Sequence, residues 1–525
     1  MKKSIYVGNG FLESQLLFVI PFVAGYAKEK GINRIIFEES LSSKLRGIRE
    51  IADILRLFIV VEIDRKYSRK YRIKNLITKF LIAGSVLLPS FRLAHASSRN
   101  GLLENVCWYD SQLRHAVWDH ALQQVKDGSL QLSFGGRLRA AASVYLAVKK
   151  ARHLVKTEGV CAAVLGHTVY AGRGLIAELR KNNVDCVAHA ANVFHRLHLN
   201  RDTAWSLMSA AEWTAAMSIV KNQDFERFWQ KRKRGESSNI ESVNASRGSR
   251  IVSTSTPKNV IFLHVFRDSP FNYIDRDRIF ADYVQWVEQT LKFIASSDES
   301  WLIKSHPSSA RWGENQEVWL TSIGNKVFGN HWPDHISIDY SEYSNINLLK
   351  HINRFVTYSG TVHLEAACFG IKPIVISNVS LASFDTSLVL KPKDLNEYKS
   401  FLMEDSGISK FELPPTAQLI AIRLLYIREE LLKFQREIGS SPIFRGDTKA
   451  AFEIEFNSVS AHVKESVPAF LRAGSLIAAG LPRTVSLRYL ETWNAAYQNE
   501  SRMFSKNIVL NPQDSFFPGA YFETD

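Results

Sequence analysis

Short apolar runs alternate with longer amphipathic stretches along the first part of the chain. Apolar runs at residues 4–8, 34–37 and 58–62 have the length of buried strands, and helical periodicity fills the intervals near 12–28 and 41–55. Strands that alternate with helices at this spacing predict βαβ units and a parallel sheet. We therefore expect the chain to begin with an α/β domain.

A second α/β rhythm begins with an apolar run at 259–266 and lasts to about residue 400. A stretch rich in charged residues and serine separates the two rhythms, which is typical of a connection between domains. At 525 residues the chain is too long for one ordinary core. We predict an N-terminal Rossmann-like domain at 1–220, a flexible linker at 221–258, a C-terminal Rossmann-like domain at 259–405 and a helical extension at 406–525.

Two polar side chains follow a buried strand of the second domain. Lys304 and His306 come at the carboxyl end of this strand, where open α/β sheets bind their ligands. Pro307 favours an extended conformation for His306 and so restricts where the imidazole points. We expect both side chains to reach solvent and to contact a phosphate. The alternative for His306 is a structural role, in which it caps a loop.

A turn of small residues, Ser359-Gly360-Thr361, precedes a predicted helix that carries Glu365 one turn in. Hydroxyls and successive backbone N–H groups in such a turn can surround an anion, and the start of a helix favours negative charge. At its position Glu365 could accept hydrogen bonds from ribose hydroxyls. The alternative is an ordinary helix N-cap with a carboxylate that interacts with the helix dipole.

Asp268 lies in the turn that follows the strand at 259–266, beside Arg267 and before Pro270. A carboxylate at the mouth of a strand can act as a nucleophile or as a general base. His264 and Arg267 either support this carboxylate or face away from it. Aspartate is common in turns, so a purely structural role for Asp268 remains the alternative.

The first domain has a matching strand end at Gly166. His167, Tyr170 and Arg173 follow it and are candidates to hold an acceptor or the reacting sugar, with helix packing as the alternative. The turn Gly8-Asn9-Gly10 needs no functional explanation, because glycine permits a close approach of the backbone there.

Basic residues exceed acidic ones by 14, which favours anionic partners without choosing among them. The four cysteines are far apart and form no CxxC pair, so neither a zinc site nor a disulfide framework is indicated, and a reducing compartment fits. The N-terminus enters a strand after four residues and shows no secretory signal, so we expect a cytoplasmic protein. No spacing of acidic residues or histidines recommends a bound metal, and no cofactor is expected.

Two basic stretches each allow two interpretations. The first, at 65–79, precedes an uncharged run about half as long as a bilayer crossing requires. It is either a solvated face before a buried element or a peripheral contact with an anionic membrane. The second, at 231–234, resembles a nucleic-acid signal, but we expect a solvated helix end and no nucleic-acid partner.

The order of the motifs resembles that of a known family. His-Val-Phe-x-Asp from residue 264, Lys-x-His-Pro from 304 and Ser-Gly-Thr-x-x-x-Glu-Ala-x-x-x-Gly from 359 are similar to bacterial capsule and O-antigen polysaccharide glycosyltransferases, especially the retaining β-Kdo transferases that use CMP-Kdo. The resemblance covers about 160–400. It implies a GT-B architecture, in which two Rossmann-like domains face each other across a cleft and the second holds the nucleotide. The His-Pro and Ser-x-Thr pieces are also similar to CMP-binding motifs of bacterial sialyltransferases, but the acidic base motif of those enzymes has no match.

The resemblance also implies roles for the candidate residues and partners. Asp268 would form a glycosyl adduct or remove a proton, and His167 would assist it. Glu365 would bind the ribose, and Tyr170 and Arg173 the acceptor or sugar. The remaining contacts to the donor, a CMP-activated acidic sugar that serves as a substrate, would come from Lys304, His306, Ser359, Gly360, Thr361 and Arg267.

The expected partners are a nucleotide sugar and a glycan or lipid-linked glycan acceptor. Two enzymatic alternatives of the same architecture remain open: a CDP-polyol phosphate transferase and a UDP-sugar hexosyltransferase or epimerase. A non-catalytic basic scaffold is disfavoured, because polar groups at strand ends have no role in it.

Overall fold

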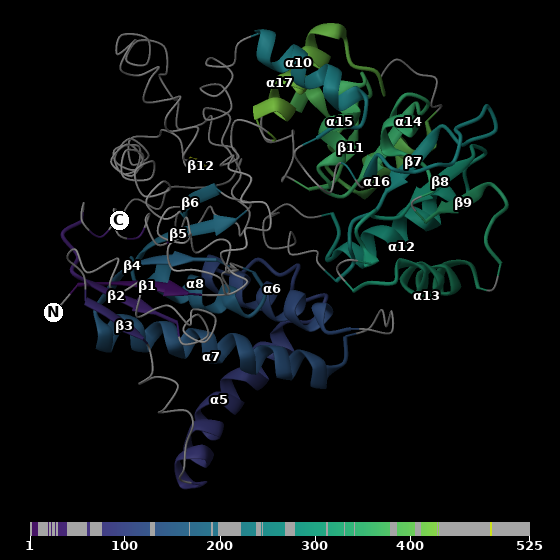
Figure 1. The fold of residues 1–525 in the computed structure, drawn as a ribbon. Helices are drawn as coiled ribbons and strands as arrows, with labels where there is room; N and C mark the ends of the chain where they lie inside the picture. Colours follow the sequence, from purple (N-terminus) through teal and green to yellow (C-terminus); the bar gives the residue numbers. More distant parts are fainter. Residues whose placement is uncertain are drawn as a thin grey trace.

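The computed structural model describes two α/β units and most of their helices (Figure 1). The described residues are 3–8, 30–38, 60–63, 76–125, 132–166, 169–190, 193–197, 222–237, 245–267, 279–310, 313–329, 331–340, 342–377, 386–404, 411–427 and 484–485, with single positions at 19, 23, 27, 243 and 429.

The first sheet has the strand order β12-β6-β5-β4-β1-β2-β3. Strands β3, β2, β1, β4 and β5 are parallel, whereas β6 runs antiparallel to β5 and β12 antiparallel to β6. Residues 484–485, which form β12, thus add to the first sheet although they come after the second sheet in the chain. The strands span Ser4–Gly8 (β1), Arg34–Phe37 (β2), Val60–Ile63 (β3), Val160–Leu165 (β4), Asp185–Ala190 (β5), Val193–Leu197 (β6) and Thr484–Val485 (β12).

The helices of the first unit whose bounds are described are α5 (Leu76–Ala96), α6 (Trp108–Gln123), α7 (Phe134–Glu158) and α8 (Gly172–Lys181). Ser133 caps α7 by accepting a hydrogen bond from the Gly136 N–H, and Gly159 ends the helix at a φ of 66°, where glycine is favoured. A Cβ at Gly174 would come within 2.6 Å of the Val144 carbonyl oxygen. The glycine therefore permits the close approach of α8 to α7.

The second sheet is parallel throughout, with the order β11-β10-β7-β8-β9. Its strands span Asn259–Phe262 (β7), Trp301–Lys304 (β8), Ile336–Asp339 (β9), Arg354–Thr357 (β10) and Ile374–Val375 (β11). The predicted fold class, α/β with two Rossmann-like domains, is confirmed. The helices of this unit are α10 (Asn222–Lys233), α12 (Tyr283–Ile294), α13 (Gln316–Phe328), α14 (Asn345–Leu349), α15 (Val362–Cys368), α16 (Leu395–Met403) and α17 (Pro415–Tyr426), with a short 3₁₀ helix, η4 (Thr386–Leu388).

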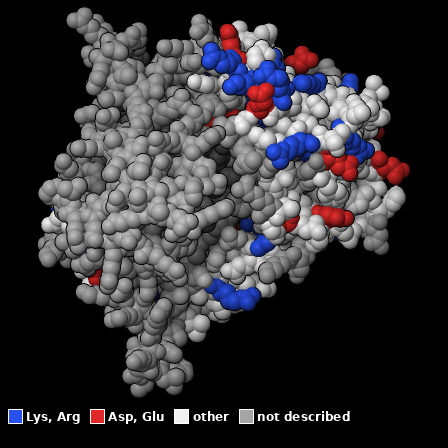
Figure 2. Space-filling view, viewed as in Figure 1, with Lys and Arg blue, Asp and Glu red and all other residues white. Residues whose placement is uncertain are grey.

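Helix α10 lies within the predicted linker, yet it packs into the second unit. Phe225 and Phe228 share an apolar cluster with residues of α15 and α17. In Figure 2 basic side chains gather over the region where Figure 1 places α10 and α17. Within the basic run at 231–234, Arg232 does not follow the expectation of a solvated helix end, because it is only 1% exposed. For this residue the expectation is wrong, because its guanidinium has a buried carboxylate partner, described below.

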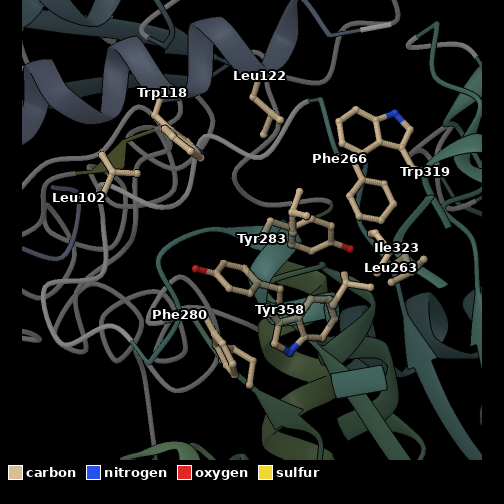
Figure 3. Packing of buried hydrophobic residues seen from close by; sticks show 14 of the residues in the cluster. Leu102, Trp118, Leu122, Leu263, Phe266, Phe280, Tyr283, Trp319, Ile323 and Tyr358 are labelled. Carbon is tan, nitrogen blue, oxygen red and sulfur yellow. The ribbon is translucent and has the colours of Figure 1, made fainter. Parts of the chain in front are cut away.

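The two units share one continuous apolar cluster (Figure 3). Trp118 and Leu122 of α6 belong to the same cluster as Phe266 and Tyr283 of the second unit. Arg99 adds an ion pair to Asp282, with Nε and Oδ2 2.8 Å apart. Because exposing apolar surface to water costs free energy, we expect these contacts to hold the two units together. Among the described helices, none combines the length and the apolar character needed to cross a membrane.

Candidate nucleotide-binding site

Three strand ends meet at the carboxyl edge of the second sheet. Strands β10, β7 and β8 are adjacent and parallel, so the residues that follow them lie at the same edge. The chain leaves β7 toward β8 and β9 and then returns on the other side of β7 as β10. The crevice between β7 and β10 is therefore the topological switch point, where open α/β sheets bind ligands. Here the Thr357 hydroxyl donates to the Phe262 carbonyl at 2.9 Å and joins the two strands.

A pair of histidines stands at this edge. The ring centroids of His264, after β7, and His306, after β8, are 5.5 Å apart, and the ring planes are tilted by 44°. The His306 Nδ1 accepts a hydrogen bond from the Ser308 N–H at 3.2 Å, so the ring proton of the neutral imidazole belongs on Nε2. Burial, with a smaller contribution from His264, lowers the pKa of His306 to about 3. His306 is thus a neutral hydrogen-bond donor at physiological pH.

Two side chains at the start of α13, Glu314 just before the helix and Gln316 as its first residue, hold the backbone around the histidines. The Gln316 side chain accepts from the His306 N–H at 2.6 Å and donates to the His264 carbonyl at 2.8 Å, and so links the two strand ends. Glu314 accepts from the N–H groups of Phe266 and Arg267 at 3.0 and 2.7 Å. Burial raises the pKa of Glu314. Neither residue could be predicted from the sequence, because the segment after β7 that both support lies about 50 positions earlier in the chain.

Lys304 does not reach solvent, which corrects the expectation from the sequence. Its side chain is 1% exposed, and Nζ lies 2.6 Å from Oδ2 of Asp339 at the end of β9. Oδ1 of Asp339 accepts from the Glu342 N–H at 2.7 Å, so the ion pair also fixes the turn after β9. Burial lowers the pKa of Lys304, and the charge of Asp339 opposes that shift. The arrangement makes Lys304 part of the support beneath the edge.

The turn at Ser359-Gly360-Thr361 follows β10 and faces the same edge. Ser359 is buried, and its hydroxyl makes no hydrogen bond to the described residues. Gly360 is half-buried and Thr361 exposed. Thr361 occupies the N-cap position of α15 but makes no capping hydrogen bond with its side chain. Within the described part of the chain, the hydroxyls of this turn are therefore not used in the way that an ordinary N-cap uses them.

Glu365 is buried beside α10 and not open at the edge. Its Oε1 accepts from Nη2 of Arg232 at 2.6 Å, while its Oε2 has no hydrogen-bond partner among the described residues. Burial raises the pKa of Glu365, and the nearby charge of Arg232 counteracts this shift. Glu429, which accepts from the Ser237 hydroxyl at 2.8 Å, adds a second carboxylate to this cluster. One oxygen of Glu365 is thus committed to Arg232.

Arg267 joins the two units. Its Nε and Nη2 donate to the carbonyl of Gln123, at the end of α6, at 2.9 and 2.6 Å, and its Nη1 donates to the Gly313 carbonyl at 2.9 Å. The carboxyl end of a helix attracts a cation, so this contact is also favoured by the dipole of α6. Arg267 reaches the neighbourhood of the edge, but its guanidinium is engaged by backbone carbonyls.

The residues expected to hold an acceptor in the first unit are mostly enclosed. Arg173 is buried and donates from Nε to the Gln112 side chain at 2.5 Å. Tyr170 is also buried and has a φ of 54°, which is uncommon for a residue other than glycine. These positions do not confirm a contact with a bound sugar. His167 lies outside the described residues, directly after Gly166, whose N–H bonds to the Gly8 carbonyl at 3.1 Å.

Asp268, the predicted nucleophile or base, also lies outside the described residues. It follows Arg267 in the chain, whose N–H is held by Glu314 at 2.7 Å. Within the described residues, no group of three or more histidine, cysteine, aspartate or glutamate side chains is arranged to hold a metal ion. The expectation that the protein uses no metal or other cofactor stays a prediction.

No protein-family model matches the chain, and no curated protein matches its sequence. Among solved structures, KpsC of Thermosulfurimonas dismutans, a beta Kdo 2,4 transferase, is 12% identical with a TM-score of 0.29, over 51% of this chain and 80% of that one. The UDP-GlcNAc 2-epimerase of Methanocaldococcus jannaschii, solved with UDP-GlcNAc and UDP, is 10% identical with a TM-score of 0.26, over 81% and 99%. CalG4, the calicheamicin glycosyltransferase, is 10% identical with a TM-score of 0.24, over 90% and 98%. These low scores do not support an argument about function, which therefore rests on the site itself.

Proposed function

We propose that the carboxyl edge of the second sheet binds the phosphate of a nucleotide sugar and that the protein is a glycosyltransferase. One observation carries this proposal. Two histidines and a turn with two hydroxyls stand together at the end of three adjacent parallel strands, at the switch point of the sheet. A scaffold protein would have no use for such a group at this position.

The protonation state of His306 suits this role. A neutral imidazole with its proton on Nε2 donates to a phosphate oxygen, and its donor capacity does not change between pH 5 and 8 because its pKa is about 3. The Ser359 hydroxyl, which has no described partner, supplies a second donor. Donors that are already oriented can stabilise the negative charge that develops on a leaving phosphate.

The donor and the reaction follow from the sequence motifs. Their resemblance to retaining β-Kdo transferases supports CMP-Kdo as the donor and a capsule or O-antigen glycan as the acceptor. Asp268, which follows the supported residue Arg267, would attack the anomeric carbon and release CMP, and the acceptor would then displace the aspartate. Glu365 is assigned no contact with the ribose, because it is buried against Arg232 and not open at the edge. Lys304 is assigned a supporting role, because its ammonium is closed off by Asp339.

A thermal-shift titration with CMP, CDP, UDP, GDP and their sugars tests this function. We expect CMP and CMP-Kdo to raise the melting temperature, and His306→Ala to lower the affinity for CMP by at least about tenfold, since a hydrogen bond to a charged group is lost. His331→Ala is the matched control, because His331 lies in the same unit with its side chain 87% exposed. The control should bind CMP as the unaltered protein does.

Two results would overturn parts of the proposal. Stabilisation by UDP-sugars alone would reject a cytidine donor and favour a hexosyltransferase or an epimerase. Stabilisation by CDP-polyols with no response to CMP-Kdo would favour a polyol phosphate transferase. If His306→Ala and His331→Ala bound every nucleotide with equal affinity, the nucleotide site would not be at the edge where His306 lies.

A further inference from the structure

Helix α5 has a reversed pattern of burial. Over residues 85–96, where the burial of α5 is described, the buried side chains are small or of medium size, namely those of Val86, Ser90 and Ala94, and they repeat every four residues. On the other side, Leu87, Leu88 and Phe91 are 60%, 58% and 49% exposed. A helix on a protein surface in water normally buries its large apolar side chains and exposes polar ones. The outer face of α5 therefore has the composition of a contact surface.

The small inner residues let α5 pack closely against α7. Ala140, Ala141 and Val144 of α7 are all fully buried, and α5 contacts α7, running obliquely to it and projecting beyond it in Figure 1. The apolar face continues from α5 to the start of α7, because the rings of Phe91 and Phe134 are 5.1 Å apart in an edge-to-face arrangement. The buried face of α5 thus consists of small and medium side chains, and the large apolar side chains of the helix lie on its exposed face.

The charge of the sequence around α5 indicates which kind of partner the exposed face of this helix contacts. From Arg65 to Leu103 the sequence contains nine lysines and arginines and no aspartate or glutamate. Arg92 is exposed on α5 directly after Phe91. An apolar face next to the exposed cation Arg92, on a helix with no acidic residue in its sequence, complements a membrane that contains anionic lipid. Self-association is disfavoured, because two copies would bring like charges together.

We propose that α5 binds the surface of an anionic membrane. Leu87, Leu88 and Phe91 enter the boundary between headgroups and acyl chains, while Arg92 contacts lipid phosphates. The contact is peripheral, and α5 lies in the plane of the interface. The inference does not depend on the proposed function, because α5 contributes no residue to the edge of the second sheet.

Vesicle flotation tests this contact with the full chain. We expect binding to vesicles of phosphatidylcholine mixed with phosphatidylglycerol, weak binding to phosphatidylcholine alone, and release by high salt. Leu88→Glu combined with Phe91→Glu should weaken binding at least about tenfold, because two apolar side chains no longer leave water. Ile251→Glu is the matched control, since Ile251 is an 84% exposed apolar residue of the other unit and should bind vesicles normally.

The other outcomes are also decisive. If the double variant melts at a lower temperature than the unaltered protein, Arg92→Glu is tested in its place. This variant keeps the apolar face and should also weaken binding to anionic vesicles. Unchanged vesicle binding in these variants would overturn the proposal. So would a concentration-dependent dimer, seen by light scattering, that the same variants abolish, because the face would then contact a second copy. Retention of the CMP-induced melting shift in the variants separates this result from the proposed function.

Discussion

Arg232 and Glu365 form a buried ion pair in which Nη2 lies 2.6 Å from Oε1. The pair joins α10, which precedes the second sheet, to α15, which follows β10. A carboxylate predicted to contact a ribose is thereby tied to a helix more than 130 residues earlier in the chain. The orientation of Glu365 therefore depends on the packing of α10.

Removing one partner of this pair should be costly. Arg232→Met leaves the Glu365 carboxylate buried without its cation, and we expect the free energy of unfolding to fall by about 3–5 kcal/mol. Chemical denaturation measures this change. Arg234→Met is the control, because Arg234 is an exposed neighbour whose solvent-screened ion pair to Glu236 should contribute little to stability. Equal stability of the two variants would show that the buried pair is not maintained in solution.

The low pKa of His306 predicts how stability depends on pH. The native ring stays neutral down to a pKa of about 3, whereas the unfolded ring takes up a proton near pH 6.5. The unfolded state thus binds more protons between these values, so the contribution of His306 to stability is lost as the pH falls from 6.5 toward 3. Between pH 7 and 5 the loss amounts to about 2 kcal/mol.

Urea unfolding of the unaltered protein and of His306→Gln at pH 7 and pH 5 measures this effect. The variant should lose less stability on acidification by about the stated amount. His331→Gln, which changes an exposed histidine, should lose as much as the unaltered protein does. Parallel losses in all three proteins would mean that His306 is solvated and titrates normally.

Lys304 and Asp339 should behave as one unit in a double-mutant cycle. Each side chain is almost fully enclosed, so Lys304→Met or Asp339→Leu alone leaves an uncompensated buried charge, at a cost of about 3–5 kcal/mol. Together the two substitutions remove both charges, and we expect the double variant to be more stable than either single variant. Additive losses, measured by chemical denaturation, would contradict the ion pair.

The shared apolar cluster predicts that the two units unfold together. Leu122→Ala should lower the free energy of unfolding by about 2–5 kcal/mol, since Leu122 of α6 is buried in the cluster that continues into the second unit (Figure 3). Leu419→Ala serves as a control, because Leu419 is 41% exposed. Equal effects of the two substitutions on tryptophan-monitored unfolding would indicate that the units do not share a core.

The sequence predicted β1, β2, β3, β4, β7 and β8, because buried parallel strands are short apolar runs. It also placed His306 at the carboxyl end of β8 and the turn at 359–361 at the start of α15. It could not establish that His264 stands beside His306, since this depends on β7 pairing with β8. The burial of Lys304 could not be predicted from the local sequence either, because its partner Asp339 is 35 residues away on β9. Arg232 shows the same limit: a run of four basic residues reads as a solvated helix end unless Glu365 is known to face it.

A crystal structure of the protein with CMP would show directly where the nucleotide binds. We expect its phosphate at the carboxyl edge of the second sheet, within about 3 Å of the His306 Nε2 or the Ser359 hydroxyl. A nucleotide bound at the carboxyl edge of the first sheet, or at any place remote from both side chains, would contradict this expectation.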